Sequence, residues 1–153
     1  CPYTPQQNGV AERKNRHLME VTRSMMFHTH VPKRFWGDAV LTACYLINRT
    51  PTKVLHDKSP FEVLNKNKPI FDHLRVFGCV CFVLVPGDLR NKLEAKSMKC
   101  MFIGYSTSQK GYKCFDPTNN RLHISRDVKF MEEVGYYDKP NWESLKDLAH
   151  STT

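Results

Sequence analysis

The sequence has no apolar stretch long enough to cross a lipid bilayer. Its longest apolar run, residues 76–85, is well short of the roughly 20 residues that a membrane-spanning helix needs. Internal repeats and low-complexity tracts are also missing. We therefore expect no membrane segment. With 41% hydrophobic and 25% charged residues, the composition favours a folded globular protein over a disordered one.

Acidic residues are too few to balance the basic ones. The chain has 15 Asp and Glu against 23 Lys and Arg, a formal net charge of +8. Residues 90–129 carry nine basic and three acidic residues, whereas residues 131–153 carry two basic and five acidic ones. A basic domain followed by an acidic tail indicates a polyanionic partner, with nucleic acid first. The alternative is a Lys-rich surface that only solvates the protein.

The sequence also lacks any Cys-x-x-Cys pair. Most of its six cysteines lie in apolar runs such as "FGCVCFVLV", which predicts reduced, buried thiols in an intracellular protein. A zinc site, as in an autonomous metal-binding regulator, stays open as an alternative. A Cys-His nucleophile is a further alternative, but apart from Cys100, which lies beside Lys99, the cysteines do not lie in the electropositive turns that activate thiols.

The first 72 residues are predicted to be helical. We expect a turn at Asn8-Gly9 and then an amphipathic helix from Val10 to about Phe27, capped by Asn8. Glu12 would then lie in the first turn, where the helix dipole favours an anion. From the residues alone, Glu12 is by default a helix-stabilising charge.

Two further helices are expected before the composition changes. An apolar stripe over residues 36–47 predicts the second helix. The third begins with a capping box, in which Ser59 is the N-cap, Pro60 the first helical residue and Glu62 the reciprocal acid. It should end near Asn65.

From about Leu74 the pattern is typical of short strands. The runs "LRVFGCVCFVLVP", "KCMFIGYS", "GYKCFDP", "RLHIS" and "RDVKF" are separated by turn signals. Five short strands within about 55 residues indicate a small β-barrel. The predicted fold class is therefore α+β, with a helical segment at residues 1–72, a barrel at 73–131 and a partly disordered acidic tail at 132–153.

Three groups of motifs resemble one known family in the same order. The stretch "YTPQQNGVAERKNRHLMEVTRSM" resembles the end of the catalytic core of retroviral and retrotransposon integrases, above all those of copia-type LTR retrotransposons. The stretches "RFWGDAVLTACYLINRTPT" and "KSPFEVLNKNKP" look like the last helices of that ribonuclease-H-like core. "HLRVFGCVCFVLVP", "KLEAKSMKCMFIGYSTSQKGYKCFDP" and "ISRDVKF" are similar to the SH3-like domain that follows it in copia-type polyproteins.

The resemblance implies a role for Glu12. In that family the Glu of this segment is the third acid of an Asp, Asp, Glu triad that binds Mg²⁺ for phosphodiester chemistry. Glu12 would then be a catalytic metal ligand in the parent integrase. The two aspartates are expected upstream of Cys1, so this chain should be inactive by itself, and whether it counts as an enzyme is left open.

The resemblance and the charge pattern also suggest residues that contact DNA. Around Glu12 these are Asn8, Gly9, Arg13, Lys14, Asn15 and Arg16. In the barrel they are Lys96, Lys99, Lys110, Lys113 and Arg126. Such contacts would be to phosphates and largely independent of sequence. Small SH3-like barrels also mediate protein contacts, so a structural or protein-binding barrel is the alternative.

Together these features predict an integrase fragment that contributes to DNA binding and DNA integration. The resemblance implies DNA, as element ends and target, and other integrase subunits as partners. It places the parent protein inside the cell, in the nucleus or a virus-like particle. The alternative is a decayed or domesticated remnant whose barrel is a protein-interaction or structural module.

Overall fold

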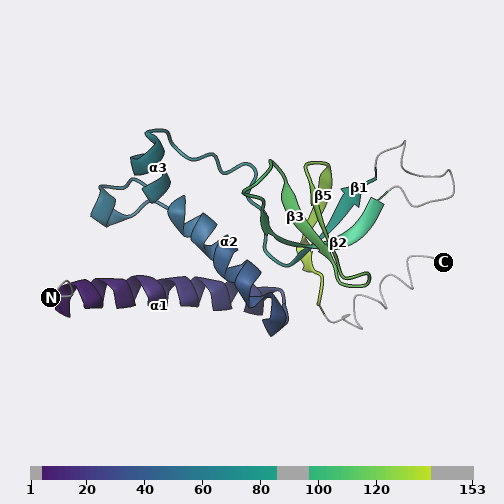
Figure 1. Cartoon of the computed structure of the whole chain (residues 1–153), viewed down its shortest axis with the longest axis horizontal. Helices are drawn as coiled ribbons and strands as arrows, with labels where there is room; N and C mark the ends of the chain where they lie inside the picture. Colours follow the sequence, from purple (N-terminus) through teal and green to yellow (C-terminus); the bar gives the residue numbers. More distant parts are fainter. Residues whose placement is uncertain (1–4, 86–96, 139–153) are drawn as a thin grey trace.

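The computed structural model describes residues 5–85 and 97–138, with helices on one side and a twisted sheet on the other (Figure 1). The helices are α1 (Pro5–His28), α2 (Trp36–Asn48) and α3 (Pro60–Asn65), with short 3-10 turns η1 (Lys33–Phe35) and η2 (Lys53–Leu55) between them. The strands are β1 (Cys79–Leu84), β2 (Ser97–Tyr105), β3 (Tyr112–Asp116), β4 (Arg121–Ser125) and β5 (Val128–Gly135). The predicted α+β class is confirmed. Within the described ranges, none of the helices is both long and apolar enough to traverse a bilayer.

Helix α1 begins earlier than predicted. It starts at Pro5, so Asn8 and Gly9 lie inside the helix rather than in a turn before it. The prediction that Asn8 caps the helix is therefore wrong, and Glu12 is not in the first turn. Proline is well suited to the first helical position, because its φ is already fixed and its missing N–H would have no helical partner there.

The third helix forms where its capping signals predict, although within the described ranges no bond from the Glu62 carboxylate back to the Ser59 N–H is found. The Ser59 hydroxyl accepts a hydrogen bond from the Glu62 backbone N–H at 3.1 Å, and Pro60 is the first helical residue. The helix ends at Asn65, and Lys66 follows with a φ of +60°. These strong local signals were sufficient to place this short element.

The five predicted strands form one antiparallel sheet in the order β4-β3-β2-β1-β5. Strand β5 runs to Gly135, past the expected end of the barrel at residue 131. An irregularity in the pairing of β1 with β5 brings Gly135 opposite Cys79. The first residues of the predicted acidic tail therefore belong to the sheet. The rest of that tail, from residue 139, lies outside the described residues.

Strand β2 is buried on both faces. Cys100 and Phe102 pack inside the barrel, against residues of β1 and β3. Met101 and Ile103 face the other way and join a core that the helical segment shares with the sheet. That core contains Met26, Val31, Phe35, Ala39, Phe77, Met101 and Ile103. The helices therefore cover one face of the barrel, and a single core spans the expected boundary at residue 72.

Candidate nucleic-acid interface

A groove of about 630 Å³ lies between the end of α2, the segment around α3 and the turn between β2 and β3. We call it the basic groove because its charged lining residues are all cationic. They are Arg49, Lys68, Lys110 and Arg126. None of the described residues that line it is acidic. Lys68, Lys110 and Arg126 are exposed at its rim, whereas Arg49 is half-buried. This arrangement attracts a polyanion.

Arg49 is held in the groove by two aromatic rings. Its guanidinium carbon lies 3.4 Å from the ring centroid of Tyr45 and 4.8 Å from that of Phe61. One guanidinium nitrogen also donates to the Tyr45 carbonyl oxygen at 3.1 Å. Such stacking fixes the plane of the guanidinium and leaves its other N–H groups available for an acceptor in that plane.

The aromatic residues that line the groove, which we call the aromatic wall, are linked by hydrogen bonds. They are Tyr45, Phe61, His73, Tyr105 and Tyr112. The Tyr45 hydroxyl is bonded to Nε2 of His73, and the Tyr112 hydroxyl donates to the His73 carbonyl oxygen at 3.0 Å. Tyr105 stacks on Tyr45 with ring centroids 4.2 Å apart, and its hydroxyl accepts from the Arg75 N–H at 3.0 Å. Burial raises the pKa of Tyr105 to about 12, so its phenol stays protonated at neutral pH.

His73 is neutral at the centre of this wall. Burial lowers the pKa of its imidazole below the ordinary value, and the nearby charges of Arg49 and Arg75 lower it further, while Asp72 acts in the opposite direction. A neutral ring can accept the proton of the Tyr45 hydroxyl at Nε2. The helical segment and the barrel are therefore joined at the groove by a hydrogen-bond network that includes the ring and the backbone carbonyl of His73.

Two of the barrel residues predicted to bind DNA meet in the groove. Lys110 lies in the turn between β2 and β3, and Arg126 lies between β4 and β5. The Arg126 Nε donates to the Lys110 carbonyl oxygen at 3.4 Å, which brings the two cations to one side of the rim. Their role in DNA binding stays a prediction, although they are grouped as such a role requires.

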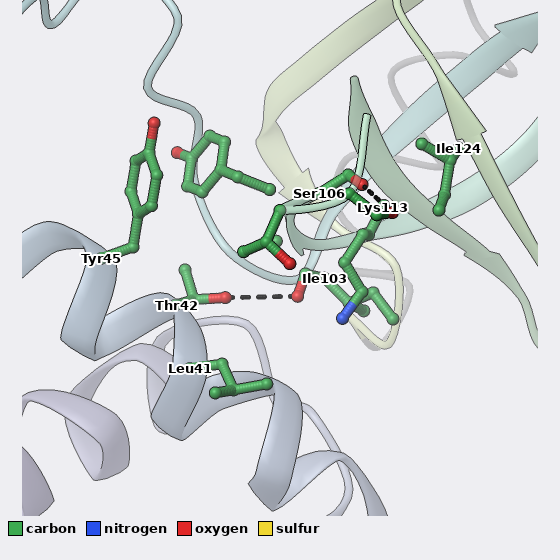
Figure 2. Close-up of a pocket in the computed structure, with 11 residues that line it drawn as sticks. Leu41, Thr42, Tyr45, Ile103, Ser106, Lys113 and Ile124 are labelled. Atoms are coloured by element: carbon green, nitrogen blue, oxygen red, sulfur yellow. Dashed lines mark hydrogen bonds between the residues drawn. The ribbon is translucent and has the colours of Figure 1, made fainter. Parts of the chain in front are cut away.

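The other predicted barrel residues lie elsewhere. Lys113 lines a neighbouring pocket of about 350 Å³ with Thr42 and Ile124 (Figure 2). Its ammonium group lies 3.3 Å from the Asp38 carboxylate. Lys99 is exposed on β2, with its nitrogen 5.4 Å from the ring centroid of Tyr136. Lys96 is outside the described residues. The predicted basic residues of the barrel therefore do not form one surface, because the helices cover part of it.

The predicted site on α1 is a solvent-exposed stretch of helix. Glu12, Arg13, Lys14, Asn15 and Arg16 are all exposed, and none of them lines the basic groove. The Arg13 Nε donates to the Gly9 carbonyl oxygen at 3.2 Å, an ordinary contact within one helix. The structure thus gives these residues an accessible position without assembling them into a pocket.

The described residues do not form a metal site around Glu12. Among them, no group of three or more His, Cys, Asp and Glu side chains converges closely enough to hold a metal ion. Mg²⁺ usually takes one or two carboxylates together with water and substrate phosphates. Glu12 by itself does not meet that need for a catalytic pair of ions. The described cysteines likewise take part in no such group, so the described residues offer no zinc site.

Sequence reasoning missed Arg49 and Lys68, and with them the groove itself. The spacing of Tyr45 and Arg49, four residues apart in a helix, was a usable signal for the stacked pair. Phe61 was read only as part of a short helix. The contribution of Tyr105 and Tyr112 was not visible either, because it depends on how the helices pack against the sheet.

Comparison with known proteins identifies the family. Residues 79–144 match the retroviral polymerase SH3-like domain. Over 131 residues, 86% of the chain, the sequence is 49% identical to the retrovirus-related Pol polyprotein from transposon TNT 1-94 of Nicotiana tabacum. It is 44% identical, again over 131 residues, to the corresponding polyprotein from transposon RE1 of Arabidopsis thaliana. The chain matches a segment of the retrovirus-related Pol polyproteins of transposons. The family resemblance seen in the sequence is thus confirmed.

The match covers a small part of each Pol polyprotein. The chain spans 10% of the tobacco polyprotein and 9% of the first Arabidopsis one. It is also 38% identical over 69 residues, 45% of its length, to an uncharacterised mitochondrial protein of Arabidopsis thaliana, of which it covers 58%. No solved structure matches the chain.

Proposed function

We propose that this segment of a retrotransposon Pol polyprotein binds DNA during integration. The observation that carries the proposal is the basic groove, whose rim cations Lys68, Lys110 and Arg126 are exposed and meet no acidic lining residue among those described. Exposed cations on a fixed rim contact phosphates of any sequence and release counterions from the DNA. The similarity to Pol polyproteins of transposons supports this role, together with the resemblance to integrases in the sequence.

A second part of the proposal concerns Glu12. We infer that, in the whole polyprotein, Glu12 supplies one carboxylate of a Mg²⁺ site whose other ligands come from outside this segment. Its support is the exposed position on α1 and the motif around it. Mg²⁺ would supply Lewis-acid chemistry at a phosphodiester. Glu12→Gln in an active polyprotein should abolish integration while leaving DNA binding by this segment unchanged. Normal integration by that variant would remove Glu12 from the site.

The DNA-binding proposal is tested on the full 153-residue chain, because the helices and the barrel share a core. Binding of a labelled duplex is measured by fluorescence anisotropy at increasing salt. Changing Lys110 and Arg126 together to Gln should weaken binding about tenfold at low salt. The same change should lower the slope of log affinity against log salt by about 2.

The matched control changes Arg121 and Lys129 together to Gln. Both residues are exposed on β4 and β5 outside the groove, and the control removes the same two charges. It should weaken binding much less. Equal effects of the two double variants would mean that net charge, not the groove, binds DNA. No binding of duplex at low salt would defeat the proposal and favour a protein-interaction module.

A further inference from the structure

The basic groove has two levels. Lys68, Lys110 and Arg126 are exposed at the rim, whereas the half-buried Arg49 lies further in, between Tyr45 and Phe61. A volume of about 630 Å³ falls in the range of pockets that enclose one small molecule. A double helix is much wider than such a space, so we expect its phosphates to meet the exposed rim cations before the half-buried Arg49. A single strand is narrow enough to bring a nucleotide to Arg49.

The contacts of the Arg49 side chain leave its guanidinium in a position to bind a phosphate group. Its guanidinium lies over the Tyr45 and Phe61 rings, and one guanidinium nitrogen donates to the Tyr45 carbonyl oxygen. The remaining N–H groups point along the guanidinium plane, which is the geometry of a bidentate bond to phosphate. Because stacking already orders the side chain, little further conformational entropy is lost when an anion binds.

The aromatic wall has few unengaged polar groups that could form hydrogen bonds with the edges of bases. The hydroxyls of Tyr45, Tyr105 and Tyr112 are each engaged with protein partners. Within the described part of the chain, the Phe61 ring contacts no other aromatic ring, and the Arg49 guanidinium lies over it. Cations beside aromatic and apolar walls favour a strand bound through phosphates and stacking, without recognition of sequence.

We propose that the basic groove binds a single-stranded stretch of nucleic acid, with one phosphate on Arg49 and its neighbours on the rim cations. This inference rests on the proposed DNA-binding function and names its substrate class. Duplex DNA binds at the rim alone, so it does not need Arg49. A single strand needs both levels, and its affinity depends on the planar, stacked guanidinium as well as on charge.

The test compares two conservative variants of the full chain. Arg49→Lys keeps the positive charge but loses the paired N–H donors of the planar guanidinium and its stacking on the aromatic rings. Arg34→Lys is the matched control, because Arg34 also lies on an aromatic ring, 4.7 Å from the Phe35 centroid, and donates to the Tyr137 hydroxyl at 3.0 Å, outside the groove. Thermal unfolding of both variants confirms that they are folded before binding is measured.

Binding is measured by anisotropy with a labelled oligothymidylate of about 12 nucleotides and with a duplex of equal length. Arg49→Lys should weaken binding of the single strand on the order of tenfold, and binding of the duplex less than about twofold. Arg34→Lys should change neither. This pattern supports the inference. An unchanged single-strand affinity in Arg49→Lys, or equal losses for both DNA forms, would overturn it.

Three further outcomes bear on this inference and on the proposed function. Binding of duplex without binding of oligothymidylate would overturn the inference and leave duplex binding at the rim in place. Binding of neither at low salt would defeat both proposals. A phosphoserine peptide that binds the groove more tightly than oligothymidylate, and loses affinity in Arg49→Lys, would overturn the nucleic-acid assignment in favour of a phosphoprotein partner.

Discussion

The Thr29 hydroxyl, just beyond the end of α1, donates a hydrogen bond to the Phe77 carbonyl oxygen, 2.9 Å away and just before β1. Thr29 is only 3% exposed. The close approach requires the next residue to be Gly78, whose φ is +82° and where a Cβ would overlap the Thr29 hydroxyl. The same arrangement recurs at α2, where the Thr42 hydroxyl bonds the Ile103 carbonyl oxygen beside Gly104. These contacts hold the helices on the barrel.

Gly78→Ala should therefore destabilise the protein strongly. An alanine there meets a positive φ, and its Cβ would lie 2.6 Å from Cγ2 of Val31 in addition to the overlap with Thr29. We expect the free energy of unfolding to fall by about 2–4 kcal/mol. Urea unfolding of the full chain, followed by circular dichroism, measures this change.

Gly37→Ala is the control for that measurement. Gly37 lies in α2, and a Cβ at this position would meet nothing within 4 Å. Alanine is the better helix former, so this variant should be unchanged or stabilised by up to about 1 kcal/mol. A loss in Gly37→Ala equal to that in Gly78→Ala would show that the close approach to Thr29 is not the cause.

Thr42→Val tests the second contact at nearly constant volume. The buried Thr42 hydroxyl is shared between the Asp38 carbonyl oxygen of its own helix, at 2.8 Å, and the Ile103 carbonyl oxygen, at 3.2 Å, and both would lose this partner. We expect a loss of about 1–2 kcal/mol in the free energy of unfolding. Thr50→Val is the matched control, because the exposed Thr50 hydroxyl bonds only the Leu46 carbonyl oxygen of its own helix. Losses of equal size would contradict a special role for the contact with the sheet.

Sequence reasoning predicted best those elements that are determined by residues close together in the chain. The cap of α3 needs only Ser59, Pro60 and Glu62. The five strands were likewise marked by their own composition and by the turns between them. The start of α1 was predicted too late because the Asn8-Gly9 pair was taken as a stronger turn signal than Pro5 was a helix-start signal. In the structure α1 begins at Pro5 and includes both Asn8 and Gly9.

The groove was not predictable because its parts are far apart in sequence. Tyr45 and Tyr105 stack although they are 60 residues apart, and Arg49 gains its role only from that packing. The same packing removed Lys113 from the predicted basic face, by placing it beside Asp38. Alternation along a strand shows which residues share a face, but not whether another element covers that face.

His73 should make stability depend on pH. Burial, and then the charges of Arg49 and Arg75, lower the pKa of His73 in the folded protein below its ordinary value of 6.5. The unfolded chain then binds a proton more readily than the folded one. The stabilisation is therefore fully present above pH 6.5 and is lost as the pH falls towards the folded pKa. His73→Gln should lose less stability than the original protein between about pH 7 and about pH 5.

The control for this prediction is His17→Gln, since His17 is exposed on α1. The pH dependence of its unfolding free energy should match that of the original protein. Urea unfolding at a series of pH values provides both curves. If His73→Gln and the original protein lose stability in parallel, the neutral ring of His73 is not what links the groove to pH.

The thiols of the barrel core should be unreactive in the folded protein. Burial raises the pKa of Cys79 and of Cys100 to about 12, so that near pH 8 only about one thiol in ten thousand is ionised. Iodoacetamide should therefore leave both residues unlabelled while the half-buried Cys44 on α2 reacts. Peptide mass spectrometry locates the label, and the same reaction in concentrated urea, where all three should react, is the control. Labelling of Cys100 as fast as Cys44 without denaturant would show that the core opens readily, and the high thiol pKa would then not protect it.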